Sequence, residues 1–483
     1  MSVLPELPKE IFDSLPQGAQ LTIRLLQEAV KSLSIEISRL QEKNRELENR
    51  LNKNSSNSSK PPSSDGLNRK PKSQRGRSGK KPGGQTGHTG KNLSQVSNPD
   101  KVFVHAPVTC SGCQTALGTI AGVCAEKRQV FDVPQPRVEI VEHQAEEKKC
   151  PCCGVLNRGV FPEDVRGPVQ YGERVQALIA YFGHQHFVPV DRVCQILEDI
   201  FGVCVSPGTC SNVDQKLYRN LEPFEVSLKL YLIASQVLHF DESGIRCEKK
   251  LSWVHVSSSL MATCYTLHAK RGQEAMDAAG ILRQFNGFAV HDHWSPYFTY
   301  SKAIHALCNA HHLRELTFIH EEAKESWAKE LKDLLIFGKS EVERYAEAGA
   351  LPREILYSIE DAYDQIVKRG LGHHALLPPL PAGNRGRRKQ RPGKNLLDRL
   401  QEKKASVLWF LRYFAVPFTN NQGEQDIRMI KLKQKISGCF RTKAGGEIFC
   451  RIRSYLSTAR KQTWNVWDAL AEAIKGSPCL LTV

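Results

Sequence analysis

The chain has 483 residues, with 67 Lys and Arg against 51 Asp and Glu, so its formal net charge is +16 at pH 7. Hydrophobic residues make up 40% and charged residues 24%, which is ordinary for a globular protein and excludes wholesale disorder or a fibrous fold. No apolar run reaches the roughly 18 residues of a membrane span, and the first residues lack the pattern of a secretory signal. We therefore expect a multidomain α+β protein of the cytoplasm with a polyanionic partner, whose 15 cysteines are thiols or metal ligands.

The positive charge is concentrated in three segments. Residues 52–100 hold 10 basic and 2 acidic side chains, residues 385–404 hold 9 and 2, and residues 424–483 hold 11 and 5, so the rest of the chain is slightly acidic. Segregated basic segments are typical of surfaces that contact a nucleic-acid backbone, although a solvated Lys-rich linker is the alternative for any one of them. For the first two segments, the expected DNA-binding residues include Lys80, Lys81, Arg387 and Arg388.

Residues 19–51 show a heptad repeat. Position d is leucine four times in succession, and position a is mostly β-branched with one asparagine: Leu26, Leu33, Leu40 and Leu47 at d, and Ile23, Val30, Ile37, Asn44 and Leu51 at a. This pattern favours a parallel two-stranded coiled coil in which the asparagine sets the register. It predicts a homodimer, and an amphipathic helix packed on its own domain is the alternative.

Residues 52–100 are rich in Ser, Pro, Gly and Lys, a composition that cannot bury enough apolar surface to fold alone. We expect a flexible basic linker here. Its glycine-rich run lacks the Gly-x4-Gly-Lys-Ser/Thr spacing, which excludes a phosphate-binding P-loop.

Two Cys-x2-Cys pairs separated by 36 residues stand within residues 101–165: Cys110 and Cys113, then Cys150 and Cys153. A tight turn presents each pair of thiolates on one side, and two such turns converge naturally on a tetrahedral structural Zn²⁺. We predict a small zinc-binding domain, with strands over 128–133 and 137–143. Cys124 and Cys152 would be spare thiols, unless Cys152 replaces Cys153 as a ligand.

Residues 166–234 have a helical pattern. One helix ends before Gly202, and a second begins with Ser206 as N-cap, followed by proline at the first helical position. Two helices joined in this way fit a DNA-binding helix-turn-helix. Ordinary helical packing is the favoured interpretation, because the second helix carries only Lys216 and Arg219 as basic residues.

Strand patterns begin after residue 235. Three alternating segments are followed by a helical segment and a short apolar strand, at residues 236–247, 251–259, 262–271, 273–284 and 287–292. This order is that of an RNase H-like α/β core, whose first part we place at residues 235–310. With the first and fourth strands parallel, Asp241 at the end of the first and Asp292 at the end of the fourth would be neighbours.

The two aspartates predict a metal site, because adjacent carboxylates repel each other unless a cation joins them. Mg²⁺ suits oxygen ligands, and two such ions (Mg²⁺ or Mn²⁺) about 3.5–4 Å apart activate a water or a 3′-hydroxyl for attack on phosphorus. The chemistry needs a third acid, for which spacing leaves Glu325, Glu330 and Glu424 open. Glu424 is favoured because in a helix it would share a face with three phosphate-binding cations: Arg428, Lys431 and Lys435.

Histidines provide further candidates. His291 and His293 flank Asp292 and raise the alternative of a mononuclear metal site, which is disfavoured because alternate strand residues face away from Asp292. His311 lies on a predicted helix with Arg314 one turn on. It would approach the acidic site or a DNA phosphate, or serve ordinary packing.

Several motifs follow one another along nearly the whole chain: the heptads, SKPPSSDG, KKPGGQTGHTG, CSGC…CPCCG, LEDIFGVCVSPGT, HFDESGIR, VHDHWSPY, CNAHHLREL and NNQGEQDIRMIKLKQKISGCFRT. In this order they resemble the insertion-sequence-66 family of bacterial DDE transposases. The resemblance implies that Asp241, Asp292 and Glu424 are the acidic triad. It also implies a mainly helical insertion over residues 311–419, after which residues 420–483 complete the core.

Two residues beside Glu424 depart from the family pattern, since Gly423 and Gln425 stand where the family has Ala and Arg. The lost arginine would weaken a phosphate contact and leaves the metal ligand intact. The hypothesis is a transposase that cleaves the ends of an insertion sequence and joins them to target DNA, and relatives travel with accessory proteins. A catalytically silent zinc-containing DNA-binding regulator and a metal-dependent nuclease without strand transfer are the alternatives.

Overall fold

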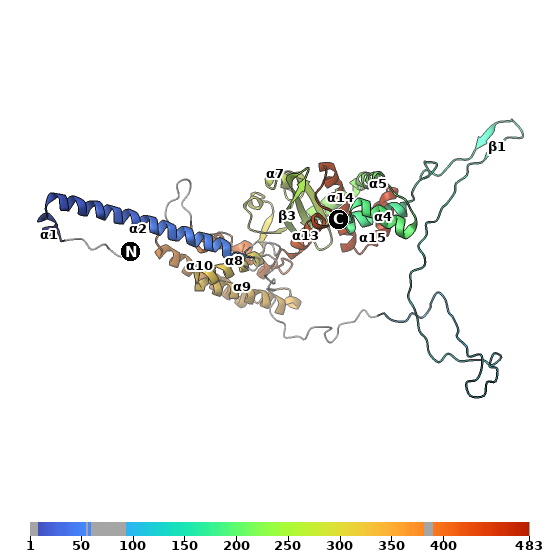
Figure 1. Cartoon of the computed structure of the whole chain (residues 1–483), viewed down its shortest axis with the longest axis horizontal. Coiled ribbons are helices and arrows are strands. Elements are labelled where there is room, and N and C mark those ends of the chain that lie inside the picture. The colour runs from blue at the N-terminus through green and yellow to red at the C-terminus, as the bar shows by residue number, and fades with distance from the viewer. Residues whose placement is uncertain (1–7, 55–56, 59–92, 381–389, 483) are drawn as a thin grey trace. The chain divides into compact units, whose positions relative to one another are not determined.

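The computed structural model describes residues 8–54, 57, 58, 93–380 and 390–482. The chain divides into a larger unit of residues 1–72, 162–193 and 206–483 and a smaller unit of residues 73–161 and 194–205 (Figure 1). Most of the predicted linker, with Lys80 and Lys81, lies outside the described residues, as do Arg387 and Arg388. Within the described ranges, no helix combines the length and the apolar character needed to cross a bilayer.

The heptad segment forms one continuous helix. A short helix, α1 (Lys9–Asp13), precedes α2 (Gln17–Asn52), which begins after Pro16 and runs for 36 residues. The leucines at position d are exposed, from 46% for Leu47 to 62% for Leu33. The heptad face therefore does not pack on the described part of its own chain, contrary to the alternative of a helix covered by its own domain.

The smaller unit contains little regular structure. Its hairpin of β1 (Glu147–Lys149) and β2 (Leu156–Arg158) brackets the second cysteine pair. The predicted strands over 128–133 and 137–143 are wrong, because these residues adopt neither helix nor strand. Their apolar side chains, such as Val130 and Ile140, are more than nine-tenths exposed, so no buried face is present against which an alternating strand could pack.

Helices precede the sheet in sequence: α3 (Glu173–Ala180), a π-helical turn (Tyr181–Gln185), α4 (Val190–Phe201), α5 (Pro207–Asn220) and α6 (Glu222–Ala234). The predicted helix boundaries are confirmed. Gly202 follows α4 with φ of +67°, a conformation that glycine adopts without strain. The Ser206 hydroxyl caps α5 by accepting a hydrogen bond from Thr209 N–H at 3.1 Å.

The larger unit is built on a five-stranded mixed sheet with strand order β5-β4-β3-β6-β7. Its elements are β3 (Val237–Cys247), β4 (Lys250–Ser258), β5 (Thr263–His268), α7 (Gln273–Ala279), β6 (Phe288–His291) and β7 (Ile304–Leu307). β4 runs antiparallel to β3 and β5, whereas β3, β6 and β7 are parallel. The predicted strand order and the parallel pairing of the first and fourth strands are confirmed. The fifth strand, β7, was not predicted. It has only four residues and comes shortly after a 3-10 turn at Ser295–Thr299, so its sequence pattern is too short to recognise.

Asp241 was expected at the end of its strand but lies in the middle of β3. The parallel pairing with β6 ends at His239, opposite Val290, and β3 then continues as a hairpin with β4. Asp241 and Asp292 each lie two residues beyond this last pair, so the register sets them side by side. The two aspartates therefore meet at the end of β6, and not at the end of β3.

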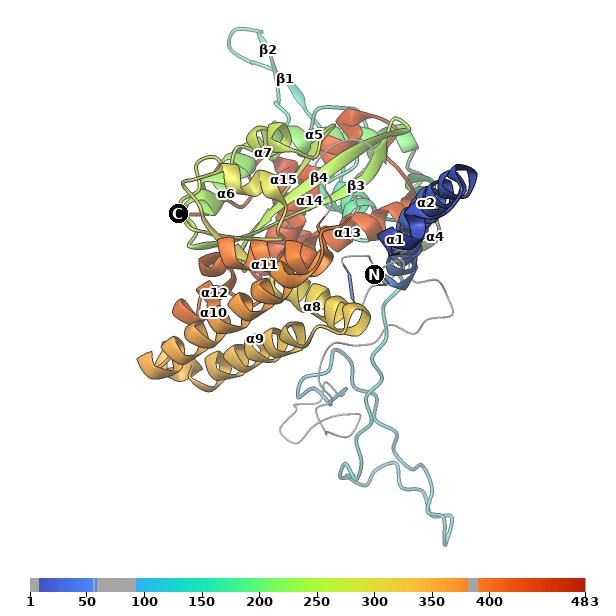
Figure 2. The ribbon, with the colours of Figure 1, turned by 90° about the vertical axis from the view of Figure 1, so that its left-hand side faces the viewer.

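Two sets of helices complete the larger unit. α13 (Asn421–Ser437) and α14 (Lys443–Lys461) pack on β3, β4 and β5 around a core that includes Ile245, Ile430 and Phe449, and α15 (Val466–Lys475) follows. The predicted insertion is helical, as expected, and its helices lie beside the sheet (Figure 2). They pack around a core that also includes Leu307 of β7. The helices of the insertion are α8 (Asn309–Ala323), α9 (Ser326–Arg344), α10 (Arg353–Leu376), α11 (Pro392–Glu402) and α12 (Lys404–Arg412), with a 3-10 turn at Ala346–Ala348.

Candidate functional site

Asp241 and Glu242 are neighbours in β3, so their side chains point to opposite faces of the sheet. On the face of Asp241, the buried Ile245 belongs to the core beneath α13. On the other face, Glu242 accepts a hydrogen bond from the Tyr297 hydroxyl at 2.7 Å. Asp241 therefore points toward α13, the helix that carries Glu424.

The structure brings Asp241, Asp292 and Glu424 together. Asp292 follows β6, and its Oδ1 accepts a hydrogen bond from Trp294 N–H at 2.9 Å. Burial and the nearby negative charges of Glu242, Asp292 and Glu424 raise the pKa of Asp241 to about 8. The three acids of the predicted triad thus share one electrostatic site, although they come from β3, β6 and α13.

Glu424 lies in the first turn of α13 with a side chain only 17% exposed. Its Oε2 is 3.6 Å from Arg428, whereas its Oε1 is buried without a hydrogen-bond partner in the described structure. The other candidate acids lie in the helical insertion. Glu325 accepts hydrogen bonds from side chains of α9 and α10, and Glu330 pairs with Arg369. Of the three candidate acids, Glu424 is therefore the one that lies beside Asp241.

The predicted basic face of α13 is present, but its three cations differ. Arg428 and Lys435 are exposed. Lys431 is exposed as well, but its Nζ donates a hydrogen bond to the Gly244 carbonyl of β3, and partial burial lowers its pKa. Lys431 thus ties α13 to the sheet, while Arg428 and Lys435 remain directed at solvent.

The histidines beside Asp292 do not form the alternative mononuclear site. His291 is fully buried, stacks on Tyr297 with ring centroids 4.3 Å apart, and shares a hydrogen bond of 2.9 Å with His305. His293 contacts aromatic rings of α8 and of the turn before β7. Both imidazoles serve packing around the strand end.

Asn420 was missed by the sequence reasoning and lies at the centre of the site. It is 2% exposed; its Oδ1 accepts from His239 Nδ1 at 2.8 Å, and its Nδ2 donates to the Phe240 carbonyl at 2.8 Å. Its own carbonyl accepts from Glu424 N–H at 3.0 Å. One residue therefore joins the strand before Asp241, through its side chain, to the helix turn of Glu424, through its backbone carbonyl. The available signal was an asparagine just before a predicted helix, which normally indicates only an N-cap.

An ion pair between the half-buried Arg271 and the buried Glu242, on the opposite face, was also missed. Arg271 donates to Glu242 Oε1 from Nε at 2.8 Å, and the Glu242 side chain is only 2% exposed. The guanidinium lies 4.1 Å from the ring centroid of Trp294, which follows Asp292 closely in sequence. This pair links β3 to the segment that carries Asp292.

The cysteine pairs form two turns of the same kind in the smaller unit. In each, the N–H of the first cysteine donates to the carbonyl five residues on, and the N–H four residues on donates back to the carbonyl of that cysteine, at 2.8–2.9 Å. The shared pattern makes Cys153, and not Cys152, the equivalent of Cys113. Hydrogen bonds from Thr115 lower the pKa of Cys113 to about 7. Across the described residues these four thiols do not gather into one cluster, so the zinc site stays a prediction.

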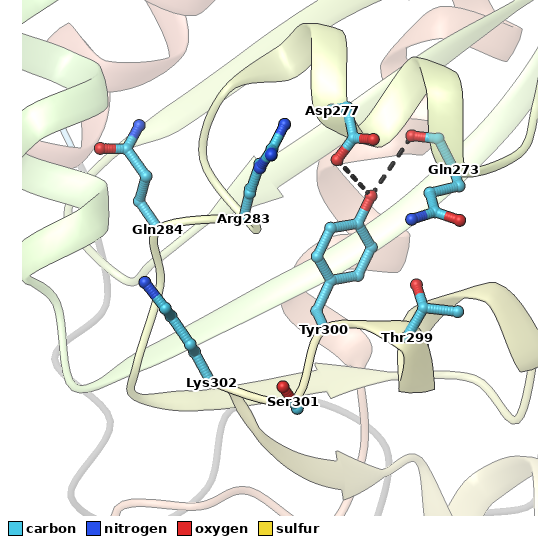
Figure 3. A pocket seen from close by; sticks show the side chains of 8 residues that line it. All are labelled: Gln273, Asp277, Arg283, Gln284, Thr299, Tyr300, Ser301 and Lys302. Atoms are coloured by element: carbon cyan, nitrogen blue, oxygen red, sulfur yellow. Dashed lines mark hydrogen bonds between the residues drawn. The ribbon is translucent and has the colours of Figure 1, made fainter.

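A pocket with a volume of about 700 Å³ lies away from the acids (Figure 3). In it the Tyr300 hydroxyl donates to Asp277 Oδ1 at 3.0 Å, beside the cationic side chains of Arg283 and Lys302. Lys302 precedes the parallel strand β7, whereas Asp292 follows β6, so the two lie toward opposite ends of these strands. The pocket contains none of the predicted site residues.

Comparison with models of protein families identifies the family of the chain. The model of the Transposase IS66 family matches residues 168–448, which is more than half of the chain. The chain belongs to the IS66 family of transposases. The matched span of this transposase includes all three acids and excludes both cysteine pairs. A family of unknown function (DUF6444) matches residues 10–94, and no curated protein matches the chain.

Proposed function

We propose that this IS66-family transposase cleaves DNA at the ends of its mobile element and transfers the freed ends to target DNA, with Asp241, Asp292 and Glu424 as its catalytic acids. The observation that carries the proposal is the convergence of these acids from β3, β6 and α13. The strand order, with β4 antiparallel at the second position, supports an RNase H-like catalytic core.

The donor set fits divalent cations with oxygen ligands, Mg²⁺ or Mn²⁺. Three carboxylates share the site, and the buried Oε1 of Glu424 lacks a partner among the described residues. Asp241, Asp292 and Glu424 would hold two ions. When bound, such ions supply Lewis-acid activation of the attacking hydroxyl and stabilise the charge that develops on the leaving oxygen.

The residues around the acids would position DNA. Arg428 and Lys435 lie one and three helical turns beyond Glu424 on the same face of α13, and their exposed cations suit phosphate oxygens. The basic segments 52–100 and 385–404 would extend this contact along the duplex and add to its salt dependence. Arg314, one turn after His311 on α8, is a further phosphate contact in this proposal.

We also propose a homodimer formed by α2 and a structural zinc ion. The exposed leucines of the heptad face support pairing with a second copy, because an apolar stripe of this length is costly in water. Across that seam Lys43 and Glu48 of opposite chains carry complementary charges. The matching turns at Cys110–Cys113 and Cys150–Cys153 support a site that closes when Zn²⁺ joins the two pairs.

The test uses full-length protein and a plasmid that carries the gene with its native flanking DNA. Asp241→Asn and Glu424→Gln are expected to bind this DNA normally and to reduce Mg²⁺-dependent nicking and joining by at least ~10³-fold. Glu330→Gln, which removes a surface partner of Arg369, is the matched control and should react like the wild type. Normal nicking and joining by Asp241→Asn would exclude the proposed triad, and nicking without joined products would favour a nuclease.

A further inference from the structure

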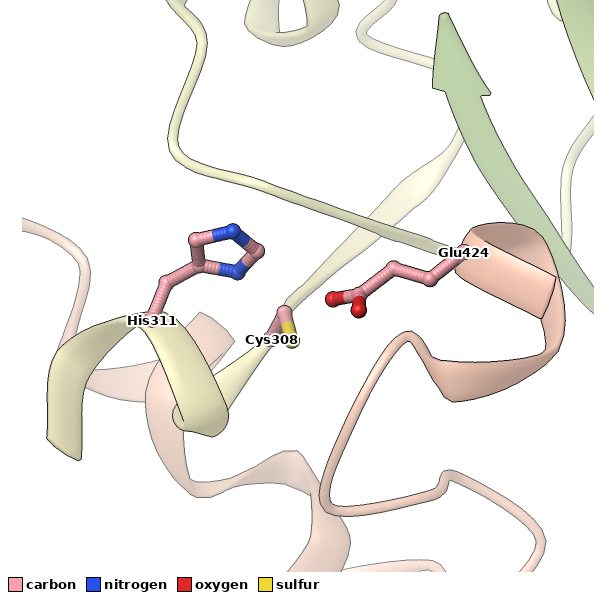
Figure 4. A group of neighbouring side chains, drawn as sticks. All are labelled: Cys308, His311 and Glu424. Atoms are coloured by element: carbon pink, nitrogen blue, oxygen red, sulfur yellow. The ribbon is translucent and has the colours of Figure 1, made fainter. Parts of the chain in front are cut away.

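Three side chains meet at the start of two helices, where β7 leads into α8 and where α13 begins. One ring nitrogen of His311, Cys308 Sγ and one carboxylate oxygen of Glu424 all lie within 4.8 Å of one another. Figure 4 shows the imidazole and the carboxylate facing each other across the thiol. The cluster therefore adds two side chains from outside the acid triad to the surroundings of Glu424.

Two atoms of this cluster lack partners. His311 Nδ1 and Glu424 Oε1 are both buried and without a hydrogen bond in the described structure. A buried polar atom without a partner costs about 1–3 kcal/mol, so two such atoms facing one another indicate a ligand that both would contact. The nearest cation on α13, Arg428, approaches the other carboxylate oxygen and is itself 66% exposed.

Cys308 does not share this feature. Its side chain is 1% exposed, and its sulfur already accepts a hydrogen bond from the Asn420 N–H at 3.1 Å. Metal binding by cysteine requires the thiolate, whereas this buried sulfur serves as an acceptor for the backbone before α13. The pair that remains open is an imidazole nitrogen and a carboxylate oxygen.

We infer that His311 supplies a nitrogen ligand to the metal ion held by Glu424, so that this position prefers Mn²⁺ over Mg²⁺. The inference rests on the proposed function and deepens it by naming the metal class. Mg²⁺ favours an octahedral shell of oxygen atoms, whereas transition ions accept imidazole readily. His311 also lies close enough to Asp292 to interact with it electrostatically, which places the imidazole beside two acids of the triad.

His293 provides a matched comparison. It also has a buried Nδ1 without a partner in the described residues. Its charged neighbours, however, are Arg399, Lys403 and Glu402 of the insertion, so its surroundings do not suit a cation. A variant at His293 removes an imidazole of similar burial without removing the proposed ligand.

The experiment is Mn²⁺ titration of the full-length protein without DNA, followed by electron spin echo envelope modulation. The wild type is expected to show coupling to one directly bound nitrogen that changes when the histidines carry ¹⁵N. His293→Gln should keep this signal. His311→Gln should lose it and bind Mn²⁺ at least ~10-fold more weakly, with Mg²⁺ affinity little changed.

Two failures can be told apart. Mn²⁺ that binds without nitrogen coupling, and whose affinity falls in Asp241→Asn, would overturn the role of His311 and leave the acid triad standing. Mn²⁺ binding that is unaffected by Asp241→Asn would overturn the triad itself. The nitrogen coupling is measured in the wild type. Its absence would therefore refute the inference even if His311→Gln does not fold.

Discussion

Asn420→Ala is expected to separate the two halves of the acid site. The Asn420 side chain makes two hydrogen bonds of 2.8 Å to β3, one with His239 and one with the carbonyl before Asp241, while its backbone carbonyl begins the helix turn of Glu424. Truncation removes both side-chain bonds at a position that is 2% exposed. The sheet and α13 then lose the polar contact nearest to Asp241 and Glu424.

The loss of stability follows from two groups of β3, His239 Nδ1 and the Phe240 carbonyl, which lose Asn420 as their hydrogen-bond partner. A buried polar group without a partner costs about 1–3 kcal/mol, so the variant should lose about 2–6 kcal/mol of unfolding free energy. A domain of ordinary stability, about 5–15 kcal/mol, remains folded at the lower end of this range. A displacement of Glu424 by about 1 Å would reduce the cleavage rate roughly 10²-fold even in the folded protein.

The assay pairs urea unfolding with single-turnover DNA cleavage at a temperature where the variant is folded. Asn421→Ala is the control, because Asn421 is the next residue, of the same type, and exposed. It should change the unfolding free energy by less than about 0.5 kcal/mol and leave cleavage intact. Wild-type cleavage by folded Asn420→Ala would refute the role assigned to this contact.

Two further predictions concern the segments outside the acid site. Leu33→Lys, at an exposed d position of α2, should convert the dimer to a monomer in analytical ultracentrifugation, because the two lysines would face each other in a parallel dimer. Ser32→Lys, one residue away and outside the apolar stripe, should remain dimeric. A dimeric Leu33→Lys would argue against the coiled coil. Elemental analysis of the wild type should find about one zinc ion per chain. Cys113→Ser should lose this zinc, whereas Cys124→Ser should retain it. Retention by Cys113→Ser would show that the two turns do not form the site.

The sequence was informative wherever a local pattern determines the structure. Alternation predicted β3, β4 and β5, heptads predicted the continuous α2, and Ser206 marked the start of α5. Each of these rests on a period or a cap that acts within a few residues. The predicted strands of the smaller unit failed for the converse reason. Their residues are typical of strands, but side chains such as Val130 and Ile140 remain exposed, so no packing holds them in a sheet.

The positions of the three acids were predicted better than the side chains that support them. Acids and cations are easy to recognise in a sequence, because a charged side chain is rarely buried without a partner. The family pattern then selected Glu424 among three candidates. Asn420, Arg271 and Tyr297 gave no such signal. Their partners are more than 25 residues away in sequence, so their roles depend on a strand pairing that cannot be derived from spacing.

Gly423 connects these two kinds of information. The resemblance to the family predicts alanine at this position beside Glu424, and here a Cβ would lie 3.0 Å from Asn420 Oδ1. Glycine in a helix costs about 1 kcal/mol relative to alanine, which at first argues against it. The missing methyl group, however, leaves the Asn420 amide free to bond to β3 without displacement. Gly423 therefore weakens the helix locally, but it avoids crowding of the Asn420 side chain, whose bonds to β3 align Glu424 with Asp241.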